Sequence, residues 1–196
     1  MDGVEVLVAA QRKFARDRNW EQFHTPKNLA MALGGEVGEL AEAVGRLVDC
    51  PEPVRAIGDP NLAEEIGDVV LYLLRLHDVT AIPTTITRLA DRSNSDDSVD
   101  PRALIRALCD LIAATGRVLE VFQWTACSSQ AGTAVRTELP ALLQAVTAHL
   151  SALSALLRID PITAAAAKIT VKAEKYPTAT CFGTAEKSAW SPKDSE

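Results

Sequence analysis

The chain has 196 residues, of which 47% are hydrophobic and 5% aromatic, and it carries a formal net charge of −6. This length is enough for one or two small domains with an apolar core. The acidic balance gives the surface no general attraction for nucleic acid or for anionic membranes, so neither is expected as a partner. Abundant Ala and Leu with few aromatic residues favour helices over strands, and we therefore expect an all-α fold.

The four cysteines, Cys50, Cys109, Cys127 and Cys181, are scattered along the chain without a CxxC pair or a nearby histidine cluster. This distribution argues against a zinc site and against a disulfide framework, and it fits a reducing compartment. No N-terminal signal pattern and no apolar run of membrane-spanning length is recognisable. We therefore expect a soluble protein of the cytoplasm.

Apolar residues recur at steps of three and four in the first part of the chain, which predicts helices over residues 4–17, 26–48 and 61–77. Thr25-Pro26 supplies an N-cap and a first helical residue for the second helix. Asn61 is expected to cap the third helix after a loop rich in Pro and Gly. Ile82-Pro83-Thr84 is expected to open a short fourth helix to about residue 91.

A polar segment, residues 91–100, is followed by a second part in which the helical pattern starts again. Helices are expected over residues 103–124 and 137–157, with a loop at 127–133. Asp160 and Pro161 then provide the N-cap and first turn of another helix. We expect the tail from residue 178 to 196 to be only loosely ordered, although Phe182 and Trp190 could dock on the protein.

Two acidic pairs stand inside apolar stretches of the first part, Glu36-x-x-Glu39 and Glu65-x-x-Asp68. A spacing of three places both carboxylates of a pair on one helix face. Two neighbouring helices could therefore direct four carboxylates at one point, which is unfavourable unless positive charge lies between them. Hard oxygen ligands of this kind suit Mg²⁺, with Mn²⁺ as the second possibility.

Acidic pairs at this spacing are also common on solvated helix faces, which is the ordinary interpretation of either pair alone. Three features favour the metal site: both pairs lie within apolar runs, they occur twice in consecutive helices, and several glycines crowd the same helices. These glycines are Gly34, Gly35, Gly38 and Gly67. Each costs a helix roughly 1 kcal/mol relative to Ala, so we expect close approach of a backbone or ligand there.

The second part resembles the first without its acids: Glu36, Glu39 and Asp68 align with Ala114, Arg117 and Ala141. We therefore predict a tandem duplication with a degenerate second copy. The predicted organisation is a catalytic repeat over residues 1–92, a linker over 93–102, a degenerate repeat over 103–177 and a C-terminal tail over 178–196.

Three segments carry a family resemblance: WEQFH-x-P at residues 20–26, GEVGELAE at 35–42 and EEIGDV at 64–69. Together they resemble the MazG-like nucleotide pyrophosphohydrolases, and within that superfamily the dCTP pyrophosphatases. The likeness resumes at residues 168–177, which are similar to the family's closing segment of basic residues, Tyr and Pro. Two departures are that the FQW triplet stands at residues 122–124 of the second part, and that Lys172 replaces the usual Asn.

The resemblance implies a MazG-like four-helix bundle and a Mg²⁺-dependent enzyme that hydrolyses a dNTP, dCTP or a modified relative, to dNMP and pyrophosphate. The metal ligands would be Glu36, Glu39, Glu65 and Asp68. Glu39 or Glu36 would take the proton of the attacking water, and the spacing does not decide between them. Family members dimerise and share residues across the interface, so we expect a homodimer of pseudo-dimeric chains.

The resemblance further implies a set of substrate-binding residues: Trp20, His24, Asn28, Trp124, Lys172, Lys175 and Tyr176. Trp124 would stack on the base, and the two lysines and the tyrosine would bind phosphate oxygens. Simpler roles stay open for several of them. His24 and Trp20 could be packing residues, as could Phe23, and the lysines could be an ordinary cationic helix end.

Two other classes of protein compete with this enzyme as interpretations of the sequence. A carboxylate-bridged di-iron bundle needs Glu-x-x-His from two helices, and the one match, Glu21-x-x-His24, lies just before a proline and is unpaired, so this class is rejected. The second is a non-catalytic helical module for dimerisation or regulation that binds a nucleotide or a partner protein. The intact four-acid cluster favours the enzyme.

Overall fold

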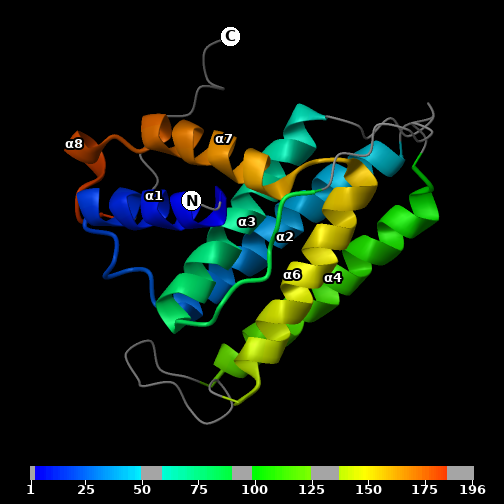
Figure 1. Cartoon of the computed structure of the whole chain (residues 1–196), viewed down its shortest axis with the longest axis horizontal. Helices are drawn as coiled ribbons and strands as arrows, with labels where there is room; N and C mark the ends of the chain where they lie inside the picture. The colour runs from blue at the N-terminus through cyan, green and yellow to red at the C-terminus, as the bar shows by residue number, and fades with distance from the viewer. Residues whose placement is uncertain (1–2, 50–58, 90–98, 125–136, 185–196) are drawn as a thin grey trace.

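The computed structural model describes residues 3–49, 59–89, 99–124 and 137–184 (Figure 1). The helices within these ranges are α1 (Gly3–Asp17), α2 (Pro26–Val48), α3 (Pro60–Thr80), α4 (Pro101–Phe122), α6 (Leu139–Leu157), α7 (Pro161–Lys175) and α8 (Thr178–Cys181). No strand occurs among the described residues, and the predicted all-α fold is confirmed.

Proline in the first turn, preceded by a polar cap, begins four of these helices. Thr25 caps α2 through its side-chain oxygen, and Asp160 caps α7, both as predicted. The predicted cap of α3 is wrong: Asp59 occupies that position, and its carboxylate accepts from the backbone N–H groups of Asn61 and Leu62 at 2.8 and 3.3 Å. Asn61 already lies inside the helix, since Pro60 takes the first helical position.

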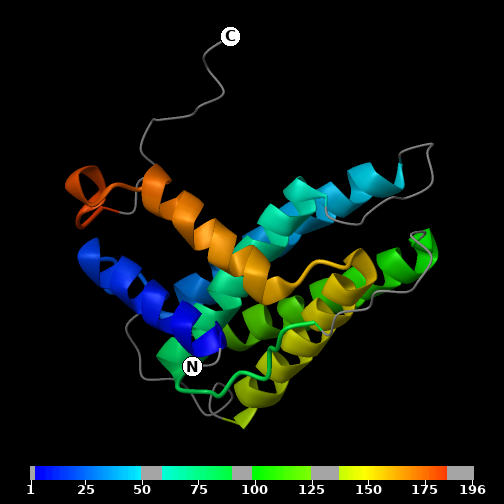
Figure 2. The ribbon, with the colours of Figure 1, turned by 45° about the horizontal axis from the view of Figure 1, so that its top comes forward.

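Four helices form an antiparallel bundle in which α2 pairs with α3, α4 pairs with α6, and α2 also packs on α4 (Figures 1 and 2). Its centre is made largely of leucines that are almost completely buried, including Leu33, Leu40, Leu73, Leu74, Leu111 and Leu143. Burial of each such side chain contributes about 1.5–3 kcal/mol. The apolar stripes of the sequence therefore build one continuous core.

Helix α7 lies beside α1, and both pack against α3 (Figure 2). Although α7 belongs to the predicted second repeat, its strongest packing is with α3 of the first. The paired arrangement of α2–α3 and α4–α6 is what a duplicated unit would need, and the duplication itself stays a prediction. The predicted loop at 127–133 and most of the predicted linker lie outside the described residues.

The predicted short helix after Pro83 is wrong over residues 82–89, which form no regular structure. Helix α3 ends at Ala81, which adopts a left-handed conformation with φ of 56°. The residues after Pro83 include a run of four β-branched side chains, which lowers helix propensity. Ile86 is buried and the Leu89 N–H donates to Asp160 at 2.9 Å, so tertiary contacts hold this segment extended across the bundle.

Two observations concern the later helices. By length and composition α6 is apolar enough to cross a membrane, with a mean hydropathy of 1.4, but buried core helices pass the same test and this is weak support for a span. After α7 the chain forms the short helix α8, in which Cys181 is buried. Phe182 does not dock and is 66% exposed, while Trp190 lies outside the described residues.

The expected close approach of a backbone is found at Gly67, whereas Gly34 faces a side chain. A Cβ atom added at Gly67 would lie 2.7 Å from the backbone oxygen of Ala164 in α7, and one at Gly34 would lie 3.0 Å from Leu119 of α4. No atom lies within 4 Å of the corresponding position at Gly35 or Gly38. Gly67 therefore sets the close approach of α3 to α7.

We expect Gly67→Ala to lower the free energy of unfolding and Gly38→Ala to raise it. In open space Gly→Ala gains roughly 1 kcal/mol of helix propensity, whereas forcing a methyl group against backbone typically costs about 1–3 kcal/mol. Urea denaturation of both variants measures the difference. Equal stabilisation by both substitutions would show that α3 and α7 are not in close backbone contact.

Candidate functional site

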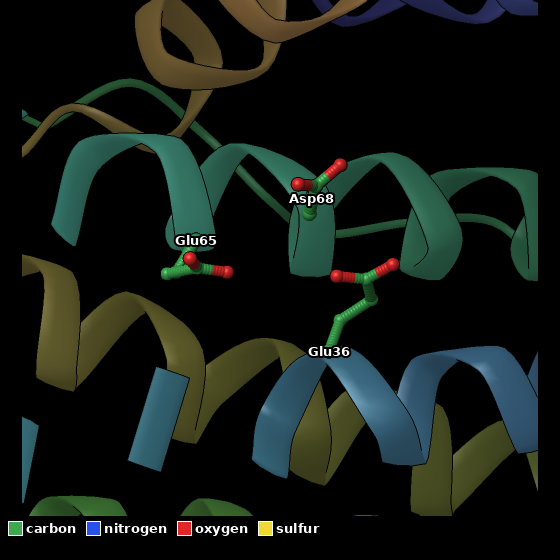
Figure 3. Close-up of side chains that lie close together, drawn as sticks. All are labelled: Glu36, Glu65 and Asp68. Atoms are coloured by element: carbon green, nitrogen blue, oxygen red, sulfur yellow. The ribbon is translucent and has the colours of Figure 1, made fainter. Parts of the chain in front are cut away.

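The facing sides of α2 and α3 bring three of the four predicted metal ligands together. Carboxylate oxygens of Glu36, Glu65 and Asp68 lie within 4.8 Å of one another (Figure 3). Glu36 reaches from α2 toward α3, which carries the other two. Asp68 is buried and the two glutamates are partly buried. This all-oxygen set matches the ligand preference of Mg²⁺ and Mn²⁺.

Crowding of these acids shows in their ionisation. Burial, followed by the charges of Asp68 and its acidic neighbours, raises the pKa of Glu36 to about 7 despite the opposing charge of Lys172. Burial and the charge of Glu39 likewise raise the pKa of Glu65. A bound cation would relieve this repulsion. Glu39 is exposed and lies outside the group of three, but its charge acts on both glutamates.

Two lysines of α7 place positive charge against the same cluster. Lys168 Nζ lies 2.9 Å from Asp68 Oδ2 and 3.1 Å from Glu64, and Lys172 Nζ lies 2.7 Å from Asp68 Oδ1. Burial alone would lower the pKa of Lys172, but Tyr72, Asp68 and Glu36 raise it above its ordinary value. The ammonium groups therefore stay charged and join α7 to α3 at the site.

A cavity of about 350 Å³ lies among α1, α2, α3, α7 and the segment between α1 and α2. Its lining includes Trp20, Phe23, His24, Asn28, Tyr72, Arg75, Lys172 and Tyr176. Two of the lining residues, Ala32 and Tyr72, each lie one helical turn from an acid of the cluster. Lys172 belongs to both regions because it lines the cavity and pairs with Asp68. The cavity and the acids therefore adjoin at Lys172.

Aromatic side chains form one wall of the cavity. The ring of Trp20 meets Phe14 and Tyr176 edge to face, with centroid distances of 5.6 and 5.2 Å. Its indole N–H donates to the backbone carbonyls of Cys181 and Thr184 at 3.0 and 2.8 Å. The segment after α7 thus fixes Trp20, which serves both as a packing residue and as a wall suited to a flat ring.

His24 occupies the cavity as a neutral side chain. Arg75 donates from Nε to His24 Nδ1 at 3.2 Å, and its Nη1 donates to Asp78 at 2.5 Å. Arg12 of α1 also donates to Asp78. Burial, with the charges of Arg75 and Lys172, lowers the pKa of His24 to about 4. At neutral pH the imidazole is therefore uncharged.

The structure separates the predicted substrate-binding residues into two groups. Trp20, His24, Asn28, Lys172 and Tyr176 line the cavity, whereas Trp124 and Lys175 do not. Trp124 follows α4, which packs on α2 away from α7, and its side chain is 88% exposed. Lys175 is exposed, with its ammonium 5.6 Å from the ring of Tyr176.

Three residues of the site were not predicted: Tyr72, Arg75 and Lys168. The first two follow Asp68 by four and seven residues, and Lys168 precedes Lys172 by four. These are spacings that place side chains on one helix face. Extending each motif along its helix by one or two turns would therefore have identified all three.

Comparison with known proteins supports the predicted resemblance over one part of the chain. Residues 24–90 match the MazG nucleotide pyrophosphohydrolase domain, so over these residues the predicted resemblance is confirmed. The chain is 48% identical over 77 residues to dCTP pyrophosphatase 1 of Rattus norvegicus and of Homo sapiens, and 47% identical to that of Bos taurus.

Each of these matches covers 37% of the chain and 45% of the relative. The chain therefore spans about half the length of the curated relatives it matches. No solved structure matches the chain.

In metal-free buffer we expect Glu36→Gln to stabilise the fold and Asp68→Asn to destabilise it. Folding raises the pKa of Glu36 from 4.5 to about 7, so ionisation of Glu36 removes stability as the pH rises through this window. Glutamine cannot ionise, and the advantage of the variant should grow from pH 4.5 to about 7 and then level off. Asparagine at 68 would instead leave Lys168 and Lys172 without their shared partner.

Thermal melting in EDTA across this pH range measures both effects. A stability difference between Glu36→Gln and the parent protein that does not change with pH would show that Glu36 is not crowded. The two substitutions remove one carboxylate charge each, so they serve as controls for one another.

Proposed function

We propose that the chain is a nucleotide pyrophosphohydrolase that converts a dNTP, with dCTP or a modified dCTP as first candidate, to dNMP and pyrophosphate. The observation that carries this proposal is that an aromatic cavity and a cluster of three carboxylates adjoin at Lys172, and we take them as the two ends of one groove. Relatives named dCTP pyrophosphatase 1 support the choice of base. The alternative of a non-catalytic module is not favoured, since the cluster is intact.

In this proposal the base occupies the aromatic end and the triphosphate extends toward the acids. Asn28 in the cavity and Glu36 in the cluster are separated by eight residues of α2, a rise of about 12 Å. Lys172 stands between the two ends, where an ammonium group can neutralise phosphate oxygens. If Asp68 bound a cation in place of Lys172, the ammonium group of Lys172 would become available to the substrate.

Glu36, Glu65 and Asp68 would hold the divalent metal, Mg²⁺ or Mn²⁺, with Glu39 joining them from the exposed side of the cluster. When bound, such an ion would neutralise triphosphate charge and would activate a water for attack at the α-phosphorus. Glu39 is the first candidate to accept the proton of that water, and Glu36 is the alternative. Lys168 keeps α7 against α3 through Asp68 and Glu64.

Three further expectations from the sequence are carried forward as proposals. They are a homodimer of pseudo-dimeric chains, a cytoplasmic location, and the absence of nucleic acid and membrane among the partners. The exposure of Met31 (61%) and Trp124 (88%) on the α2–α4 side supports a partner chain there. Analytical ultracentrifugation decides the first of these, and a monomer at all concentrations would contradict it.

A panel of common and methylated dNTPs with Mg²⁺ and with Mn²⁺, assayed by release of pyrophosphate, tests the proposed activity. We expect turnover of dCTP or a modified dCTP, and no turnover of any of them in EDTA. Hydrolysis of none of the nucleotides would contradict the proposal. Release of orthophosphate in place of pyrophosphate would contradict the assigned point of attack.

Substitution at the two ends of the groove should have different kinetic effects. We expect Glu65→Gln to lower kcat by at least about 100-fold, because metal ligands act on the transition state. Lys172→Met should raise KM for the nucleotide more than it lowers kcat, because it removes a phosphate contact. Lys175→Met is the matched control, since Lys175 does not line the cavity, and it should leave both constants nearly unchanged.

A further inference from the structure

Arg75 is a buried cation whose contacts are not those of a phosphate-binding residue. Only 9% of its side chain is exposed, although it lines the cavity. Its Nη1 is 2.5 Å from Asp78, and its Nε donates to Nδ1 of His24 at 3.2 Å. Arg12 holds Asp78 from the side of α1. The guanidinium is thereby fixed between an anchored carboxylate and the imidazole.

This contact determines which nitrogen of His24 carries the proton. A guanidinium has donors but no acceptor, so Nδ1 can only accept from Arg75. A neutral imidazole has one protonated nitrogen, and in His24 that nitrogen must be Nε2. The lowered pKa of His24, about 4, keeps the ring in this neutral form. The histidine therefore offers a single donor, Nε2–H, to a ligand.

Asn28 is oriented in a comparable way on the neighbouring helix. Its Nδ2 donates to the backbone carbonyl of Phe23 at 3.0 Å. A backbone carbonyl only accepts, so the amide NH₂ group is directed to it and Oδ1 is left as the acceptor. The lining of the cavity therefore includes a donor in His24 and an acceptor in Asn28 whose polarity the protein scaffold fixes.

We propose that Arg75 is a positioning residue for base specificity, which acts by holding His24 as an Nε2–H donor in the cavity that Asn28 also lines. The inference rests on the proposed nucleotide function. The pair fits a base edge with an unprotonated ring nitrogen next to an amino group, as in N3 and N4 of cytosine. Uracil and thymine have a protonated N3 and a carbonyl at position 4, so both contacts would be reversed.

The tautomer can be tested without a nucleotide. In the full-length protein labelled with ¹⁵N-histidine, we expect His24 to show a protonated Nε2 and an unprotonated Nδ1. The signals are assigned by comparison with His24→Ala, since the chain has 3 histidines. Arg75→Met should give a mixture of both tautomers, and Arg75→Lys should retain more of the original one. A protonated Nδ1 in the parent protein would overturn the proposal.

The effect on specificity is measured as the ratio of kcat/KM for dCTP to kcat/KM for dUTP. We expect Arg75→Met to lower this ratio about tenfold, the equivalent of roughly 1.4 kcal/mol and close to one hydrogen bond. The lower kcat/KM for dCTP should result mainly from a higher KM. Arg88→Met is the matched control, because it removes another arginine–aspartate pair, to Asp160 at 3.3 Å, outside the cavity.

The outcomes separate this inference from the proposed function. An unchanged ratio in a folded Arg75→Met protein would overturn the role of Arg75 even if dCTP is a good substrate. Turnover of no nucleotide would contradict the proposed function, and the ¹⁵N shifts would still decide whether Arg75 sets the proton of His24. A lowered ratio in Arg88→Met as well would show that the effect is a general loss of stability and would count against the proposal.

Discussion

The accumulation of negative charge between α2 and α3 is the constraint to which the rest of the structure responds. Carboxylates of Glu36, Glu65 and Asp68 within 4.8 Å of one another would repel in the absence of a cation. Lys168 and Lys172 of α7 offset part of this repulsion, and Gly67 lets α7 come close enough for them to do so. Packing and electrostatics are therefore coupled at one place.

The positive charge of the lysines compensates only part of the negative charge of the acids. Both lysines pair with Asp68, and the two glutamates retain raised pKa values. Fully compensated acids would form a structural ion-pair network with little affinity for a metal. Acids without any compensation would oppose folding. With Asp68 paired and Glu36 crowded, α7 is joined to α3 while negative charge remains that a cation would neutralise.

Local sequence spacing was sufficient to predict the helices and the acids, and it failed where distant segments decide the structure. The three-residue spacing of each acidic pair predicts a shared face; α3 brings both Glu65 and Asp68 to the cluster, whereas α2 brings Glu36 and leaves Glu39 exposed. Proline at residue 83 suggested a helix start, but contacts with Asp160 hold that segment extended. The family motif predicts Trp124 at the site, but α4, which precedes it, packs on the other side of α2. No periodicity in the sequence indicates this packing.

In the predicted second copy three of the four acids are replaced, and the surroundings of one of these positions disfavour a carboxylate. Ala114, which aligns with Glu36, is only 3% exposed within the core around α4. A carboxylate there would lose its hydration without gaining the lysines that α7 supplies to α3. Since α7 packs on α3 and α1, the α4–α6 pair has no helix that could compensate such a charge in the part of the chain that the structure describes. Its contacts with α2 instead support the helix that carries Glu36.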